Sequence, residues 1–152
     1  MSKGQEIPRE FALIEAHKFL ERFAFCFTKT MICGSIRRKC SVVHDIDIVV
    51  VPDNTPEFGK FFLLGRKKLS RKDCLVPIEI YVASEQDWGS QILMWTGSMK
   101  FNIRCRARAK ALGWKLSQYG LADEYGNVFE STSEERIMNY LFGRTYLPEE
   151  RE

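Results

Sequence analysis

The 152-residue sequence lacks the features that mark exported, membrane and metal-cluster proteins. No stretch approaches the roughly 18 uncharged apolar residues of a membrane helix, and the N-terminus has no apolar signal-peptide core. The five cysteines are scattered without a Cys-x-x-Cys pair, and only two histidines accompany them. Neither a disulfide framework nor a zinc site is therefore expected. We predict a reduced, soluble protein that is cytoplasmic, or associated with a nucleoid or a virus, and that is neither secreted nor bound to a membrane.

The composition that remains is that of an ordinary folded protein, with 45% hydrophobic and 28% charged residues. A chain of this length suits one domain or two small lobes. Its net charge of +3 hides an uneven distribution, because residues 97–115 carry six basic side chains and no acid. Residues 60–73 carry six basic side chains and one acid, whereas residues 120–152 carry eight acids and three bases. Such a chain can turn a basic face towards a polyanion, although a solvated helix face would have the same charge.

Residue spacing predicts an α+β fold, also describable as α/β, whose two lobes meet near residue 85. In the first lobe, apolar residues recur at helical spacing over 8–26, with Pro8 acceptable in the first turn. The other elements expected there are strands at 29–33, 42–51 and 75–83, a short helical turn at 35–39, a weak helix or strand at 57–64 and a basic turn at 65–73.

The second lobe has the pattern of helices separated by short strands. Ser131 or Thr132 is placed to cap the last helix, and Glu134 or Glu135 is placed to complete a capping box. The elements expected before that helix are helices at 86–94 and 98–112 and strand-like pieces near 114–121 and 127–129.

Two aspartates on one expected strand are the first candidates for chemistry. Asp45 and Asp47 are separated by one apolar residue, so both carboxylates should project from one face of the strand. Oxygen ligands of this kind suit a pair of Mg²⁺ ions. A lone Asp-x-Asp is more often a solvent-facing acidic edge, so the pair decides nothing by itself.

A Gly-Ser pair upstream strengthens the metal hypothesis by adding a candidate phosphate site. Gly34 allows a sharp turn after a strand, Ser35 supplies a hydroxyl donor, and Arg37 or Arg38 supplies a guanidinium suited to phosphate. A third carboxylate on an adjacent strand would complete a two-metal site, and Glu79 has that setting.

The order of these motifs resembles the nucleotidyltransferase superfamily, and more closely the family X DNA polymerases, the group of DNA polymerase beta and terminal transferase. The resemblance implies a palm with a mixed β-sheet over residues 1–85 and a small α/β thumb over residues 86–152. It is carried by Gly34-Ser35 with Asp45-x-Asp47, by Trp95-Thr96-Gly97-Ser98 with Asn102 and Arg106, by residues 113–121, and by Tyr146-Leu147-Pro148-Glu149-Glu150-Arg151.

The resemblance also implies site residues and a reaction. Asp45, Asp47 and Glu79 are expected to hold two Mg²⁺ ions, for which Mn²⁺ would substitute. The implied reaction is Mg²⁺-dependent transfer of a dNMP from a dNTP to the 3′-hydroxyl of a DNA primer-template or gapped DNA, by a monomer. The nucleotide-binding residues are expected to be Gly34, Ser35, Arg38, His44, Trp95, Gly97 and Asn102, and the DNA-binding residues Lys100, Arg104, Arg106, Arg108 and Lys110.

Departures from the family pattern keep alternatives open. The third acid is usually Asp, and Glu79 is one methylene longer. His44 and Trp95 resemble terminal transferase, whereas Asn102 resembles the template-dependent branch, so template use is undecided. A nucleotidyltransferase of the same fold acting on RNA ends, a small molecule or a protein is one alternative, and a catalytically weak DNA-binding relative is another.

We also expect neither the family's N-terminal lyase domain nor its DNA-binding helix-hairpin-helix motif.

Overall fold

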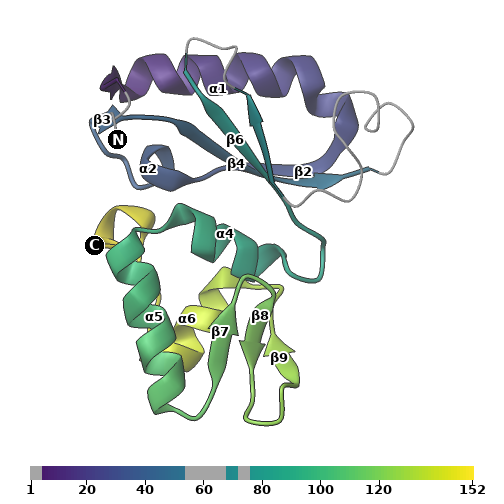
Figure 1. Ribbon diagram of the computed structural model, residues 1–152, viewed down its shortest axis with the longest axis vertical. Coiled ribbons are helices and arrows are strands. Elements are labelled where there is room, and N and C mark those ends of the chain that lie inside the picture. The colour runs from purple at the N-terminus through teal and green to yellow at the C-terminus, as the bar shows by residue number, and fades with distance from the viewer. Residues whose placement is uncertain (1–4, 54–67, 72–75) are drawn as a thin grey trace.

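The computed structural model describes residues 5–53, 68–71 and 76–152. Two lobes lie one above the other, the first built on a mixed β-sheet and the second on helices and a small antiparallel sheet (Figure 1). The α+β fold expected from the sequence is therefore confirmed. Within the described ranges, no helix is both long and apolar enough to cross a bilayer.

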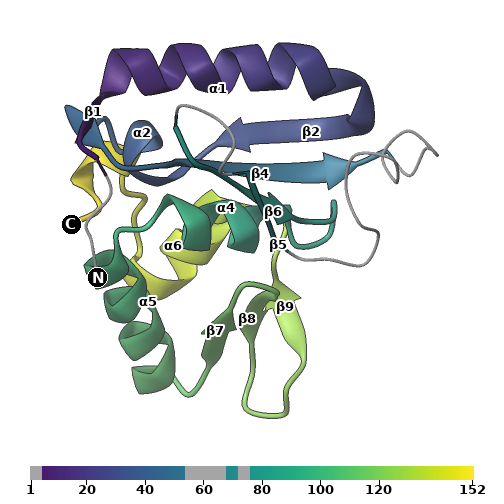
Figure 2. The ribbon, with the colours of Figure 1, turned by 45° about the horizontal axis from the view of Figure 1, so that its top comes forward.

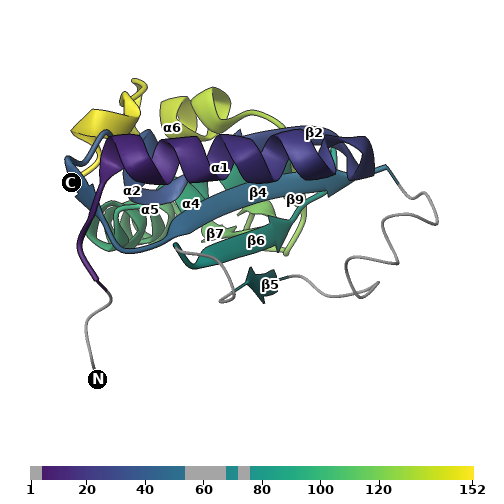
Figure 3. The ribbon, with the colours of Figure 1, turned by 90° about the horizontal axis from the view of Figure 1, so that it is seen from above.

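The first lobe is a four-stranded sheet with one long helix laid over it (Figures 2 and 3). The sheet has the order β2-β4-β6-β5, in which β4 and β6 are parallel and the other neighbours are antiparallel. The elements are β1 (Ile7–Pro8), α1 (Arg9–Phe23), the 3-10 turn η1 (Ala24–Cys26), β2 (Phe27–Ile32), α2 (Gly34–Arg37), β3 (Val42–Val43), β4 (Ile46–Pro52), β5 (Lys68–Arg71) and β6 (Ile78–Val82).

Helix α1 forms because its apolar residues fall on one face. Ala12, Ala16, Phe19 and Phe23 are buried against the sheet, at the three- and four-residue spacing that a helix needs. Pro8 stands immediately before the helix, where its missing N–H costs no intrahelical hydrogen bond. The helix predicted over 8–26 is confirmed, with its last three residues forming η1.

The central strands β4 and β6 are buried on both faces, which explains the almost unbroken apolar run of β4. On one face, Ile48 and Ile80 pack beneath α1. On the other face, Val49 and Tyr81 pack with Trp88 of α4. The carboxylate-bearing positions of β4 and β6 share the face that looks towards α4.

The second lobe packs around its own apolar core. Phe101 of α5, Leu121 of β8 and Ile137 of α6 are fully buried in it. The elements are α4 (Trp88–Thr96), α5 (Met99–Ala111), β7 (Lys115–Ser117), β8 (Gly120–Ala122), β9 (Val128–Glu130), α6 (Glu134–Phe142) and the 3-10 turn η2 (Pro148–Glu150).

The single strand predicted over 42–51 is wrong. The chain forms two strands there, because β3 pairs with β1 while β4 pairs with β2 and β6. The bend between them holds His44 and Asp45, so Asp45 precedes β4 and does not lie on it with Asp47. The two aspartates therefore reach the site from a bend and a strand, not from one strand face.

Two further local predictions are wrong. Part of the basic turn expected over 65–73 is a strand, because β5 pairs antiparallel with β6. The last helix is capped by Ser133, whose hydroxyl accepts from the Arg136 N–H, and the Ser131 hydroxyl donates to the Gln86 carbonyl instead. The helix or strand expected over 57–64 lies outside the described residues.

Candidate functional site

Asp47 and Glu79 are side by side on the sheet face that looks towards α4. They are register partners on the parallel strands β4 and β6, so about 4.8 Å separates their backbones. Both residues are half-buried, as is Asp45 in the bend immediately before β4. The fold thus brings two of the three predicted metal ligands together and leaves the third at the start of the same strand.

Tyr81 adds an aromatic hydroxyl to this pair. It lies two residues beyond Glu79 on the same face of β6, and its hydroxyl donates to Asp47 Oδ1 over 3.3 Å. Burial raises the pKa of the Tyr81 hydroxyl above its ordinary range, and the negative charges of Asp47, Glu79 and Asp45 raise it further. The hydroxyl therefore stays protonated, and the field of all three carboxylates reaches it.

Gly34 lies directly against the Asp47 carboxylate. Its φ of 61° is in the left-handed region, and a Cβ on its backbone would overlap Asp47 Oδ2. The preceding residue, Cys33, donates its N–H to the Asp47 carbonyl over 2.7 Å. A glycine is needed here for both its backbone conformation and its lack of a side chain.

Replacing Gly34 with alanine is expected to impair the site more than the fold. The left-handed backbone should cost about 1–2 kcal/mol of stability, and displacement of the Asp47 carboxylate should lower the primer extension expected from the sequence resemblance about 10²-fold. Gly143→Ala is the matched control, because Gly143 has a φ of 67° and no atom within 4 Å of its Cβ position. Primer extension and urea unfolding of both variants test this; equal activity in the two would contradict it.

The residues fit divalent metal ions in donor type and in backbone placement. Their ligands would be carboxylate oxygens, the donors that Mg²⁺ prefers. As their side chains are oriented, the described residues include no group of three or more His, Cys, Asp or Glu close enough to hold an ion. The fit therefore rests on the Asp47–Glu79 register and on the position of Asp45 before β4.

A buried ion cluster joins the turn after β2 to the end of the chain. Arg37 of α2 donates to both carboxylate oxygens of Glu134 at 2.7 and 2.8 Å. Arg151 donates to the same two oxygens at 2.8 and 3.1 Å, and its side chain is only 2% exposed. Arg37 also donates to the Thr96 hydroxyl at 2.7 Å. This Arg37–Glu134–Arg151 cluster fixes α2, α4 and α6 relative to one another.

Glu134 should make the stability of the protein sensitive to acid. Burial alone would raise the pKa of its carboxyl, but hydrogen bonds and charge from Arg37 and Arg151 outweigh burial and lower it. Because the pKa of Glu134 is lower in the folded than in the unfolded state, the ionised carboxylate stabilises the folded state at pH values above the unfolded pKa of about 4.3. This stabilisation is lost as the pH falls further. The free energies of unfolding of wild type and Glu134→Gln, measured with urea, should differ by a constant amount above pH 5 and should converge in acid. A difference that does not depend on pH would contradict the assignment.

Most of the predicted nucleotide-binding residues lie where α2 meets the end of α4. Arg38 donates to the Thr96 carbonyl at 2.5 Å, and its guanidinium lies against Gly97. The Trp95 ring stacks on Tyr81, with centroids 3.7 Å apart and planes 15° apart. Ser35 lies in the first turn of α2, and His44 is exposed in the bend before β4.

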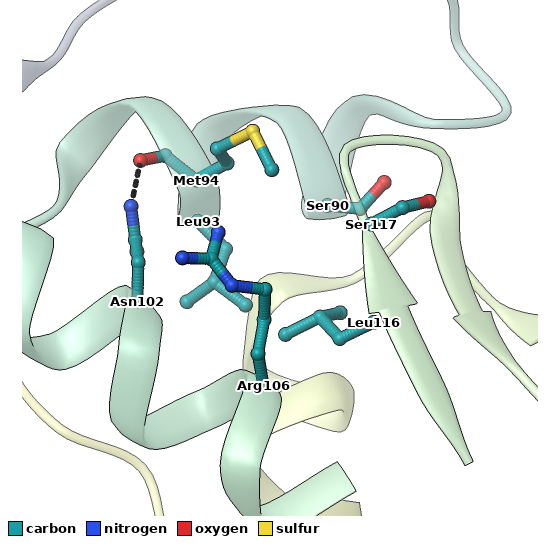
Figure 4. Close-up of a pocket in the computed structure, with 7 residues that line it drawn as sticks. All are labelled: Ser90, Leu93, Met94, Asn102, Arg106, Leu116 and Ser117. Atoms are coloured by element: carbon teal, nitrogen blue, oxygen red, sulfur yellow. Dashed lines mark hydrogen bonds between the residues drawn. The ribbon is translucent and has the colours of Figure 1, made fainter. Parts of the chain in front are cut away.

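A recess lies between α4, α5 and β7 (Figure 4). Asn102 donates its amide to the Met94 carbonyl at 2.8 Å, and Arg106 points its guanidinium towards α4 (Figure 4). A residue predicted to contact nucleotide and one predicted to contact DNA therefore share one recess. It is lined by Ser90, Leu93, Met94, Asn102, Arg106, Leu116 and Ser117.

The predicted DNA-binding residues of α5 fall into two groups. Arg104 donates to the Tyr146 hydroxyl at 3.0 Å, and Arg108 donates to the Leu141 carbonyl at 2.8 Å. These two arginines hold α5 against α6 and the chain end. All five residues are exposed, but the side chains of Lys100, Arg106 and Lys110 have no ion pair or hydrogen bond to other described residues.

Sequence reasoning missed Tyr81 and the Arg37–Glu134–Arg151 cluster as parts of the site. Strand alternation does place Tyr81 on the same face as Glu79, which is a signal that could have found it. Arg37 and Glu134 are 97 residues apart, and no local pattern pairs residues at that separation. The recess between α4 and α5 carried no sequence signal either.

Comparisons with known proteins identify what the chain is similar to. Residues 91–152 match the sequence model of the DNA polymerase beta thumb. A Repair DNA polymerase X of African swine fever virus is 26% identical over an alignment of 169 positions that covers 98% of this chain and 97% of the relative. The same protein from two other isolates of the virus is 28% and 27% identical, with 78% and 80% of both chains covered.

Proposed function

Because the chain is similar to Repair DNA polymerase X over nearly its whole length, we propose that it is a minimal family X DNA polymerase that fills short gaps. It would transfer a dNMP from a dNTP to a DNA 3′-hydroxyl as a monomer. Residues 1–85 would act as the palm and residues 86–152 as the thumb. The observation that carries the proposal is the parallel register of Asp47 and Glu79, with Asp45 immediately before the same strand.

The proposed chemistry is in-line displacement at the α-phosphorus of the dNTP. The bond from the primer oxygen to the α-phosphorus forms as the bond to the β-phosphate oxygen breaks, and pyrophosphate leaves. Two Mg²⁺ ions would supply Lewis acidity at the attacking and leaving oxygens. Asp45, Asp47 and Glu79 would hold those ions, and Glu79 would accept the proton of the 3′-hydroxyl. Mn²⁺ should substitute for Mg²⁺.

The dNTP would lie where α2 meets the end of α4. Ser35 and Arg38 would contact its phosphates, because they occupy the turn beside Asp47. Trp95 and Gly97 would contact the sugar, and Asn102 would contact the base from the recess between α4 and α5. Gly34 leaves room for the Asp47 carboxylate, and His44, which precedes Asp45 in the exposed bend, would contact the nucleotide.

Contacts to DNA phosphates should come from the exposed basic residues of α5. Lys100→Ala and Lys110→Ala should each reduce the slope of log affinity against log salt by about 0.9. Lys18→Ala is the matched control, because Lys18 is exposed on α1, on the other face of the sheet from α4, and pairs with Glu15; its removal should leave the slope unchanged. DNA binding by fluorescence anisotropy between 50 and 200 mM salt tests this, and equal slopes in all three variants would refute it.

A primer-extension series tests the proposed function itself. The protein is offered single-stranded, template-primer and one-nucleotide-gap DNA, with dNTPs or NTPs and with Mg²⁺ or Mn²⁺. We expect metal-dependent addition, strongest on the gapped substrate. Labelling of an RNA end, a small molecule or a protein in place of DNA would contradict the polymerase assignment. Tight DNA binding without nucleotide addition in either metal, by wild type or by Glu79→Asp, would indicate a DNA-binding relative without polymerase activity.

A further inference from the structure

Tyr81 touches both halves of the proposed site. Its hydroxyl donates to Asp47 of β4, and its ring stacks on Trp95 of α4. We propose that Tyr81 is a positioning residue that orients Asp47 towards a divalent ion and supports Trp95 beneath the sugar of the nucleotide. This inference rests on the proposed function, because it assigns a role around the same metal and nucleotide sites.

The Asp47 carboxylate is contacted on two sides, and its backbone is held as well. Tyr81 donates to Oδ1, Oδ2 lies where a Cβ of residue 34 would be, and the N–H of Cys33 donates to the backbone carbonyl of Asp47. Hydrogen bonds to a metal-ligating carboxylate set its orientation, and loss of such a partner costs about 10- to 100-fold in metal affinity. The Tyr81 hydroxyl is therefore expected to contribute to metal binding although it would not itself be a ligand.

The Trp95 ring is fixed from two directions. Its indole N–H donates to Gln91 Oε1 at 2.8 Å within α4, and its face stacks on Tyr81 at 3.7 Å. Tyr81 is only 6% exposed and lies on β6 in the middle of the sheet, so it offers a rigid support. A stacked aromatic pair is worth about 0.5–1.5 kcal/mol beyond its buried area.

The two contacts of Tyr81 can be separated by substitution. Tyr81→Phe removes the hydroxyl and keeps the ring, so it should weaken metal binding and leave the Trp95 stack intact. Tyr81→Leu removes both. The control is Tyr125→Phe, because Tyr125 is 82% exposed on the turn between β8 and β9 and lies outside the site.

The first measurement is Mn²⁺ binding to the protein alone, followed by electron paramagnetic resonance. We expect the Kd for Mn²⁺ to rise about 10-fold in Tyr81→Phe and to stay at the wild-type value in Tyr125→Phe. The second measurement is primer extension at saturating Mn²⁺. The KM for dNTP should be unchanged in Tyr81→Phe and should rise about 2- to 10-fold in Tyr81→Leu, which lacks a ring to stack on Trp95.

The outcomes separate this inference from the function on which it rests. An unchanged Kd for Mn²⁺ in Tyr81→Phe, with wild type binding Mn²⁺ and extending primers, would overturn the inference and leave the polymerase assignment standing. Wild type that neither binds Mn²⁺ nor extends a primer would overturn both. A raised KM for dNTP in Tyr81→Phe equal to that of Tyr81→Leu would also overturn the inference, because it would signal general disruption in place of two separable contacts.

Discussion

Replacing Asp47 with asparagine is expected to lower primer extension by about 10²-fold or more while the protein stays folded. The amide keeps an oxygen that can accept from Tyr81, so the sheet loses no hydrogen-bond acceptor. The substitution removes the negative charge that would help to balance the charge of a divalent ion beside Glu79. Gel-based extension of a one-nucleotide gap measures the loss.

Asp53→Asn provides a matched control for that experiment. Asp53 lies immediately beyond the other end of β4, where its N–H donates to the Cys26 carbonyl at 3.0 Å. The same change of charge at this distance from the site should leave extension at the wild-type rate. Full activity in Asp47→Asn would refute the metal site, and equal losses in both variants would point to net charge as the cause.

Replacing Glu134 with alanine is expected to lower the free energy of unfolding by about 3–5 kcal/mol. The substitution leaves the guanidinium groups of Arg37 and Arg151 close together without the carboxylate that both contact, and Arg151 is almost fully buried. Such a loss is a large share of the roughly 5–15 kcal/mol that stabilises a typical domain. Urea unfolding followed by circular dichroism measures it.

The neighbouring residue supplies the control. Glu135 is exposed on the same first turn of α6, so Glu135→Ala should change stability by no more than about 0.5 kcal/mol. A third variant that replaces Arg37, Glu134 and Arg151 together by apolar residues of similar size should regain much of the loss. A small effect of Glu134→Ala, matching that of Glu135→Ala, would show that the cluster contributes little.

Most secondary structure could be predicted from the sequence because it depends on local spacing. Helix α1 and the three longest strands follow from apolar periodicity and from punctuation by Gly and Pro. The break at His44 and Asp45 could not be predicted, because it arises when β3 and β4 pair with different partners. Ser133 caps the last helix, whereas Ser131 donates to the carbonyl of the distant Gln86, a contact that spacing does not encode.

The candidate site was predictable in its residue types more than in its contacts. The acids Asp47 and Glu79 and the turn at Gly34 are visible as motifs. The partners that orient them are not: Tyr81 is 34 residues from Asp47, and Arg37 is 97 residues from Glu134. Which basic residues of α5 hydrogen-bond to other parts of the protein likewise depends on where α6 and the chain end pack.

The two-sided burial of the sheet means that one register serves both folding and chemistry. Side chains alternate along β4, so a slip of one residue would turn Ile48 towards α4 and drive the charge of Asp47 into the apolar layer under α1. The apolar residues therefore specify where the acids stand, and the cost of burying Asp47 adds to the penalty against a slipped register. A descendant of this chain could lose every acid of the site and still keep the same strand alignment.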